Sequence, residues 1–233
     1  TCYMNRNEPG PGEDLAAVFA HNGIPVTLAE KERCCGMPKL ELGDLESVRE
    51  AKEVNIPVLA KLVDAGWDLT ALVPSCVLMF KQELPLMFPD DPEVQKVKNA
   101  FYDPFEYLML RNKEGKLKTD FKSPLGKVSY HAACHQRVQN IGPKTKEALS
   151  LVPGTEVDII ERCSGHDGTY AVKKEYHEYA VKIVKPVVKR INEAQPDHYG
   201  SDCAMAGHHI GHIRADGSSP EHPITLLRKA YGI

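Results

Sequence analysis

Residues 32–38 read ERCCGMP, and residues 161–167 read ERCSGHD. The two stretches share Glu-Arg-Cys and a glycine at the fifth position, and they lie 129 residues apart. Adjacent cysteines rarely form a disulfide with each other, because the ring would strain the peptide between them. Free cysteine can also pack as a small hydrophobe, but packing alone does not explain why the motif recurs. The recurrence indicates a site that the chain builds twice.

The cysteines outside these motifs follow the same repeat. The first half contains Cys2, Cys34, Cys35 and Cys76 with the spacing C-x31-CC-x40-C; the second contains Cys134, Cys163 and Cys203 with the spacing C-x28-CS-x38-C, and Ser164 stands in place of the second cysteine of the pair. Seven cysteines are an odd number, and the chain is too long to need disulfide staples. This usage favours a reducing compartment and thiols kept for metal or redox chemistry.

The segments between the cysteines predict the fold class. A glycine precedes a short β-type run before each motif, with Gly23 before Val26–Leu28 and Gly154 before Val157–Ile160. After each motif come a long helical pattern and a short strand that leads to a cysteine, in LTALVPSC and DHYGSDC. Alternating strands and helices predict parallel sheets covered by helices. We therefore predict an α/β fold of two tandem pseudo-repeated domains, each a small parallel sheet flanked by helices. The cysteines are expected at the C-terminal ends of the strands, where such sheets bind ligands.

The repeat also predicts the domain boundaries. We expect a first cysteine-rich domain over residues 1–87, a connector over 88–127 with a helix at Asp103–Leu110, and a second cysteine-rich domain over 128–233 that ends in an amphipathic helix. The prolines inside the two long helical patterns, Pro57 and Pro186, should kink or divide those helices.

Composition excludes several function classes. The chain of 233 residues is 42% hydrophobic and 26% charged, with a net charge of −3, which argues against nucleic acid as the main partner. No apolar run approaches the length of a transmembrane helix, and no leader pattern opens the chain. We expect a cytoplasmic protein, or one peripheral to the inner membrane through a complex. The start at Thr1 without a methionine suggests that a segment upstream has been removed or left out.

The spacing of the thiols favours iron and sulfur over zinc. Structural zinc sites usually use short C-x2–4-C knuckles, and the chain has no CxxC. Adjacent cysteines fit poorly as two vertices of one zinc tetrahedron, whereas two neighbouring thiolates can ligate a polynuclear cluster. A zinc-binding or scaffold module remains the alternative.

The residues TCYMN, ERCCGMP and VPSC, followed by YHAACH, ERCSGH and SDCAMAGHH, resemble the cysteine-rich CCG domain family. Its members include the B subunit of heterodisulfide reductase and the C-terminal part of the C subunit of anaerobic glycerol-3-phosphate dehydrogenase, and the iron–sulfur proteins of glycolate and lactate oxidation are similar. The resemblance covers essentially the whole chain. It implies an iron–sulfur electron-transfer subunit of a larger oxidoreductase complex.

The resemblance carries four ligands over to the first site: Cys2, Cys34, Cys35 and Cys76. Met79 stands where the heterodisulfide reductase member has a fifth cysteine, so the type of cluster is open between an ordinary [4Fe–4S] cluster, a noncubane one and [2Fe–2S]. We expect a [4Fe–4S] cluster there.

The second site has only Cys134, Cys163 and Cys203 to carry over. A second cluster or another metal there leaves one corner open. The candidates for that corner are histidines near the predicted strand ends: His131, His135, His166, His208 and His209. A weak oxygen ligand from Ser164 and an empty site are the other interpretations. Gly36 and Gly165 are expected to let the backbone turn tightly against the clusters.

Three functions follow from these sites. The first is electron relay between a flavoprotein or ferredoxin-like donor and a quinone, reached through a membrane partner, or a protein acceptor. The chain shows no nucleophile–base dyad and no glycine-rich dinucleotide motif, so no catalytic residue is named. The second is a cluster-based heterodisulfide reductase, with the open second site as its reaction centre. The third is the zinc or scaffold module.

Overall fold

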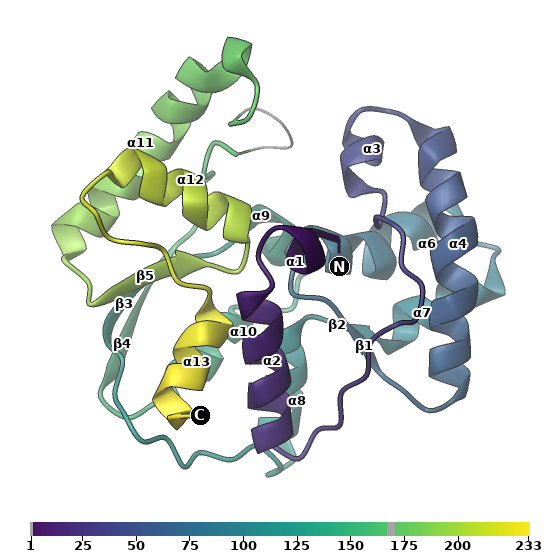
Figure 1. Ribbon diagram of the computed structural model, residues 1–233, viewed down its shortest axis with the longest axis horizontal. Helices are drawn as coiled ribbons and strands as arrows, with labels where there is room; N and C mark the ends of the chain where they lie inside the picture. The colour runs from purple at the N-terminus through teal and green to yellow at the C-terminus, as the bar shows by residue number, and fades with distance from the viewer. Residues whose placement is uncertain (1, 167–170) are drawn as a thin grey trace.

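Two small parallel sheets, each covered by helices, form the protein (Figure 1). The computed structural model describes residues 2–166 and 171–233, without the side chain of Cys2. We call residues 2–125 the first half and residues 126–233 the second half. The predicted α/β class with parallel sheets is confirmed.

The sheet of the second half has three strands in the order β4-β3-β5. They are β3 (Gly126–His131), β4 (Thr155–Ile160) and β5 (His198–Ser201), and all pairs are parallel. His131 pairs with both Ile160 and Ser201, so the three strands end at one edge. The strands predicted at 157–160 and in DHYGSDC are therefore confirmed, and each strand is followed by a cysteine at this edge.

The sheet of the first half is smaller and differs from the prediction. It contains only β1 (Leu69–Thr70) and β2 (Phe101–Tyr102), which are parallel. The strand predicted at Val26–Leu28 is wrong, because residues 24–30 form neither a strand nor a helix. An isolated extended segment has no neighbour for its backbone groups, and the described strand pairings include none between this segment and β1. Val26 and Leu28 are exposed.

Because this strand is not formed, the predicted positions of the cysteines at strand ends also need correction. Cys2, Cys34 and Cys35 have no strand before them in the described chain, so the placement of all seven cysteines at strand ends holds fully only for the second half. In the first half, β1 alone leads toward a cysteine, Cys76.

Helices make up most of the remaining chain. In the first half they are α1 (Cys2–Arg6), α2 (Gly10–His21), α3 (Met37–Glu41), α4 (Leu45–Asp64), α5 (Pro74–Leu78), the π-helical turn η1 (Met79–Glu83), α6 (Leu84–Met87), α7 (Pro92–Ala100) and α8 (Pro104–Lys113). In the second half they are α9 (Cys134–Arg137), α10 (Lys144–Leu149), the 3-10 turn η2 (Lys174–Tyr176), α11 (His177–Ala194), α12 (Ala204–Arg214) and α13 (Pro223–Tyr231).

The two long predicted helices are confirmed as α4 and α11. Neither is divided at its proline, since each is a single helix that contains Pro57 or Pro186. Asp44 caps α4 by accepting a hydrogen bond from the backbone of Ser47 at 3.2 Å. The predicted C-terminal amphipathic helix is α13, whose apolar face is buried.

The segment between the repeats is structured. Residues 88–127 hold α7, β2 and α8, and β2 pairs with β1. The helix predicted at Asp103–Leu110 is confirmed and extends to Lys113. Asp103 caps it, accepting from the backbone of Phe105 at 2.9 Å and of Glu106 at 3.3 Å.

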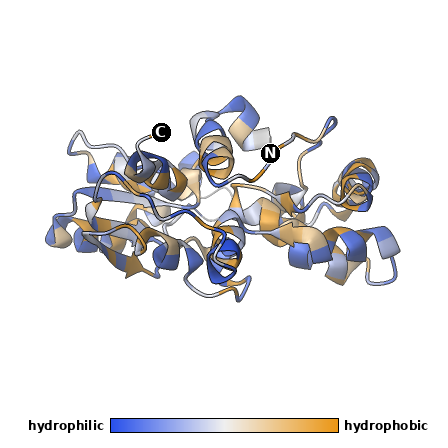
Figure 2. Ribbon diagram, turned by 90° about the horizontal axis from the view of Figure 1, so that it is seen from below, coloured by the Kyte–Doolittle hydropathy of each residue, from blue (hydrophilic) through white to orange (hydrophobic). Residues whose placement is uncertain are grey.

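The two halves share one hydrophobic core. The largest cluster of buried apolar side chains includes Val18 from α2, Val128 from β3 and Ile224 from α13. The helices at the two ends of the chain, α2 and α13, lie side by side (Figure 1). Figure 2 shows the helices with both hydrophobic and hydrophilic residues, as expected when one face of each is buried. In the described residues, no helix has both the length and the apolar character needed to cross a membrane.

Candidate metal centre

Three thiols of the first half lie in contact. Cys35 is hydrogen-bonded to Cys34 on one side and to Cys76 on the other. Cys35 and Cys76 are buried, and Cys34 is partly exposed. The hydrogen bond with Cys34 lowers the pKa of the Cys35 thiol, but the hydrogen bond with Cys76, burial and the charge of Cys76 outweigh it and raise the pKa overall. Buried sulfurs crowded in this way need cations to become thiolates together.

A buried amide holds the loop that presents this pair. The side chain of Asn55 on α4 accepts a hydrogen bond from the backbone N–H of Arg33 at 2.8 Å. It also donates to the carbonyl oxygens of Arg33 at 3.2 Å and of Cys34 at 3.3 Å. Asn55 therefore fixes the backbone directly before Cys35. Sequence reasoning missed this residue; its signal is a polar amide within an otherwise apolar helix face.

Gly36 makes the turn after the pair. Its φ of +98° is a left-handed conformation that favours glycine. A Cβ at this position would lie 3.5 Å from the end of the Met79 side chain. Met79 is fully buried against this turn.

The thiols of the second half lie at the carboxyl edge of its sheet. Cys134 is the first residue of α9, and Cys203 directly precedes α12. Burial raises the pKa of Cys203 to about 11, and the charge of Cys134 adds to the rise, so these two sulfurs lie near each other. Cys163 is exposed, and its Sγ accepts a hydrogen bond from the backbone N–H of Gly165 at 3.3 Å.

The position that matches Cys35 holds a buried serine. Ser164 is 8% exposed, and its Oγ accepts a hydrogen bond from the backbone N–H of His166 at 3.5 Å. Gly165 follows with a φ of +73°, the counterpart of Gly36. A Cβ on Gly165 would lie 2.4 Å from the carbonyl oxygen of Ala180, so α11 packs directly on this turn.

His131 supports the second loop. Its Nε2 donates to the carbonyl oxygen of Arg162 at 2.8 Å, and its Nδ1 accepts from Ser201 Oγ at 2.9 Å. Burial lowers the pKa of His131, which favours the neutral ring. Both ring nitrogens are used by these hydrogen bonds in the structure.

The remaining candidate histidines point in different directions. His135 Nε2 lies 3.7 Å from Glu41 Oε1, and His208 Nε2 lies 2.9 Å from Glu8 Oε2. His209 is buried, and its Nε2 has no hydrogen-bond partner among the described residues. His166 is partly buried beside Ser164 and Gly165. Across residues 2–166 and 171–233, no three His, Cys, Asp or Glu side chains are arranged to hold a single metal ion.

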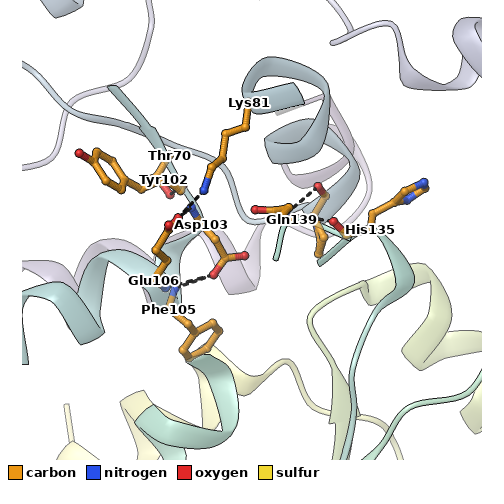
Figure 3. A network of polar contacts seen from close by, with 9 residues as sticks. Thr70, Lys81, Tyr102, Asp103, Phe105, Glu106, His135 and Gln139 are labelled. Atoms are coloured by element: carbon orange, nitrogen blue, oxygen red, sulfur yellow. Dashed lines mark hydrogen bonds and ion pairs between the residues drawn. The ribbon is translucent and has the colours of Figure 1, made fainter. Parts of the chain in front are cut away.

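The two sets of cysteines meet at the junction between the halves. Helix α5, which contains Cys76, packs against α9, which begins at Cys134. Gln139 Nε2 donates to the carbonyl oxygen of Pro74 at 3.4 Å and to that of His135 at 3.1 Å (Figure 3). Burial and the charges of Glu8 and Cys203 raise the pKa of Tyr3, which places α1 of the first half close to Cys203.

A buried acidic network lies beside Cys203. Asp202 accepts hydrogen bonds from Tyr130 and, at 2.9 Å, from Thr145. Burial raises the pKa of Asp202 to about 8, and the charge of Asp103 contributes to the rise. Burial likewise raises the pKa of Asp103 to about 6. Sequence reasoning missed this network, although Asp202 stands directly before Cys203.

Asp103 lies where the small sheet of the first half meets α8. Next to it, Lys81 Nζ and Glu106 Oε2 form an ion pair at 2.6 Å, and Thr70 Oγ1 donates to the carbonyl oxygen of Tyr102 at 2.9 Å (Figure 3). These contacts join η1 to α8 and β1 to β2.

The donor chemistry of the first site fits an iron–sulfur cluster. Its described donors are three sulfurs in a chain of contacts, Cys34, Cys35 and Cys76, rather than a mixed shell around one point. All-thiolate sets are typical of iron–sulfur ligation. The second site offers fewer sulfurs. The side chain of Cys2, predicted as a ligand of the first site, lies outside the described residues, as does the segment 167–170.

Each α/β half carries a set of cysteines, and the two sets meet where α5 packs against α9. This arrangement defines a tandem cysteine-rich protein. The family model for the cysteine-rich domain CCG matches residues 1–81 and 128–210, and the chain belongs to this family. The expected resemblance is thereby confirmed.

Several named proteins are similar to this chain. The C subunit of anaerobic glycerol-3-phosphate dehydrogenase from Escherichia coli (strain K12) is 31% identical over 236 residues, which cover 98% of this chain and 57% of that protein. Lactate utilization protein A of Bacillus cytotoxicus is 28% identical over 87% of this chain and 84% of its own length. The corresponding protein of Geobacillus kaustophilus is 27% identical over the same shares. The chain thus spans little more than half the length of the Escherichia coli relative.

Proposed function

We propose that the protein is an iron–sulfur electron-transfer subunit of an oxidoreductase complex. The contact chain of Cys34, Cys35 and Cys76 carries this proposal, because buried thiols in mutual contact are stabilised when iron binds them. The similarity to one subunit of a dehydrogenase supports it.

The residues have separate parts in this function. Cys34, Cys35, Cys76 and, by family resemblance, Cys2 would hold the first cluster, and Cys134, Cys163 and Cys203 a second one. Such clusters supply one-electron redox chemistry at a potential tuned by burial and hydrogen bonds. Asn55 and Gly36 hold the first loop in place; His131 and Gly165 hold the second. The packing of α5 on α9 keeps the two sets close, as an electron relay requires.

The [4Fe–4S] type of the first cluster is part of the proposal, as are the partners. A flavoprotein dehydrogenase or a ferredoxin-like protein or domain would be the donor. A quinone, reached through a membrane partner, or a protein would be the acceptor. The net charge of −3 is consistent with protein partners rather than nucleic acid.

Metal analysis tests the proposal. Protein purified without oxygen should contain iron and acid-labile sulfide, and Cys35→Ser should lose the electron paramagnetic resonance signal of the first site. Cys163→Ser should leave that signal in place, and Ser75→Ala, next to Cys76, serves as the matched control. Zinc without labile sulfide would refute the proposal and support the zinc or scaffold module.

A cluster-based disulfide reductase is the second candidate. The exposure of Cys134 and Cys163 favours it, because an open second site is reachable by a substrate. Reduction of a small disulfide with a viologen donor would measure this activity. Sustained turnover that Cys163→Ser abolishes would favour the reductase over the relay.

A further inference from the structure

An exposed apolar stripe follows one side of α11. It consists of Tyr176, Tyr179 and Ile183, which are spaced three and four residues apart and therefore share one side of the helix. Tyr179 is 57% exposed. The apolar face that holds α11 on the sheet is a different one, and it is buried. At its N-terminal end the helix reaches outward from the body of the molecule (Figure 1). We call these three residues the α11 stripe.

The helix that carries the stripe is positively charged. Residues 171–194 contain six Lys or Arg and three Asp or Glu, although the whole chain has a net charge of −3. Lys182 Nζ lies 5.6 Å from the centre of the Tyr179 ring, in a cation–π contact. Among the described residues, neither Lys182 nor Lys185 forms an ion pair, whereas two other cations of α11 do. The stripe is therefore bordered by cations whose charge is available to a partner.

This surface borders the loop that carries an exposed thiol. Gly165, two residues after Cys163, packs so closely on α11 that a Cβ there would overlap the carbonyl oxygen of Ala180. Arg162, directly before Cys163, lines one surface pocket together with Lys185. The side chain of Cys163 is exposed. A molecule docked on the stripe and its lysines would thus lie beside an accessible thiol of the second site.

The stripe suits a protein partner better than a membrane surface. A helix that lies in a membrane interface buries a broad apolar face, but the broad apolar face of α11 is already buried on the sheet. Glu175 and Glu178 stand beside the stripe and would be repelled by anionic lipids. Exposed tyrosines are typical of protein interfaces, and cations at the rim attract an acidic partner. A small surface of this kind is sufficient for a transient redox encounter.

We propose that the α11 stripe, with Lys182 and Lys185, is the docking surface for an acidic redox protein that exchanges electrons with the second site beside Cys163. The inference rests on the proposed function and deepens it, because it names the kind of partner and the place where it binds. One electron leaves the reduced partner and reduces the cluster held at the second site; no bond forms or breaks. The lysines speed the encounter, and the stripe holds the complex.

Binding of an acidic plant-type [2Fe–2S] ferredoxin to the complete protein tests the surface by calorimetry. Binding should weaken as salt is added. The double variant Lys182→Glu with Lys185→Glu should bind about ten-fold or more weakly at low salt. The double variant Lys98→Glu with Lys113→Glu has the same change of charge on exposed positions of the first half and should bind like the original protein. Absent binding, or equal binding by the two double variants, would overturn the proposal.

The apolar part of the surface has its own test. Tyr179→Ala should weaken binding of the same ferredoxin about five-fold at both low and moderate salt, because an apolar contact is not screened. Unchanged binding would overturn the stripe as a docking surface. Vesicles that contain phosphatidylglycerol should not retain the protein in a flotation assay. Retention that the Lys182→Glu and Lys185→Glu variant loses would assign the surface to a membrane and overturn the protein partner.

Stopped-flow reduction separates this inference from the proposed function. Oxidised protein is mixed with reduced ferredoxin or with dithionite, a small donor that needs no docking surface. The ratio of the ferredoxin rate to the dithionite rate should fall about ten-fold in the Lys182→Glu and Lys185→Glu variant. An equal ratio in protein that contains iron and labile sulfide would overturn the docking surface alone. Protein without iron would refute the proposed function, and the electron exchange with it, whatever the calorimetry shows.

Discussion

The two halves hold the same loop by different means. The arginine of each motif, Arg33 or Arg162, has its carbonyl oxygen fixed by a buried polar side chain. Asn55 on helix α4 does this in the first half, and His131 on strand β3 does it in the second. With the prolines of the long helices aligned, Val184 stands where the first half has Asn55. The feature common to both halves is the hydrogen bond to the loop, and the element that supplies it depends on which strands are present.

The donor sets differ in the same way. The first half buries Cys35 in contact with two other thiols, whereas the second buries Ser164 and leaves Cys134 and Cys163 exposed. The same place in the fold therefore holds three thiols in contact in the first half, and a buried serine with two exposed cysteines in the second half. Substitutions at matching positions of the two halves should therefore have different effects on stability or on bound iron.

The largest difference is expected at the two motif glycines. Gly165→Ala should cost about 3 kcal/mol or more of the free energy of unfolding, because strain at positive φ adds to the overlap with the Ala180 carbonyl. Gly36→Ala meets only ordinary contacts and should cost about 1–2 kcal/mol from the backbone conformation alone. Denaturant unfolding of both variants measures the difference; equal costs would contradict the tighter packing of the second turn.

The next effect concerns His222, which joins the halves. Its Nε2 donates to the carbonyl oxygen of Asp202 at 3.1 Å, and it is also hydrogen-bonded to the backbone of Leu72. Burial lowers the pKa of His222 to about 4, so the unfolded chain, with a pKa near 6.5, binds the proton more tightly.

Acidification from pH 6.5 to pH 4 should therefore reduce the free energy of unfolding, by up to about 3 kcal/mol from this group. His222 also caps α13, since its Nδ1 accepts a hydrogen bond from the backbone N–H of Ile224 at 3.2 Å. The variant His222→Asn can replace this cap through its side-chain oxygen and should lose this part of the pH dependence. Unfolding curves at pH 7 and pH 5 test it. An unchanged slope in the variant would assign the pH dependence to other groups.

A smaller and more local effect is expected for Asn55→Val, which places the residue of the second half in the first. Loss of its hydrogen bonds should cost about 1–3 kcal/mol and reduce iron bound at the first site only. Iron analysis and electron paramagnetic resonance measure this, with Asn99→Ala on the exposed surface of α7 as the control. Loss of iron from both sites would mean general unfolding rather than a local role.

The smallest change in stability is expected for Ser164→Cys. The two side chains have similar size, so the free energy of unfolding should change by less than about 1 kcal/mol. The restored pair should nevertheless raise the iron content of the second site, since it recreates the motif of the first. An unchanged iron content would show that the open site is limited by something other than the missing thiol.

Much of the fold followed from local signals. The glycine break and the β-type run predicted β4, and helical spacing predicted α4 and α11; the helices predicted at 103–110 and at the C-terminus are α8 and α13. The strand at Val26–Leu28 carried the same local signal and did not form. A strand needs a neighbour to satisfy its backbone, and no local pattern reports whether the neighbour is present.

The sequence by itself determined the cysteine repeat, the α/β class and the family, because spacing and alternation are properties of the chain. Only the tertiary structure decided which groups support the sites. Asn55 lies 21 residues from Cys34 in the loop that it holds, and Asp202 lies 72 and 57 residues from its partners Tyr130 and Thr145, so their roles depend on burial and distance. The junction that brings Cys76 and Cys134 onto neighbouring helices is likewise a tertiary contact, as is the packing of α2 on α13 from opposite ends of the chain.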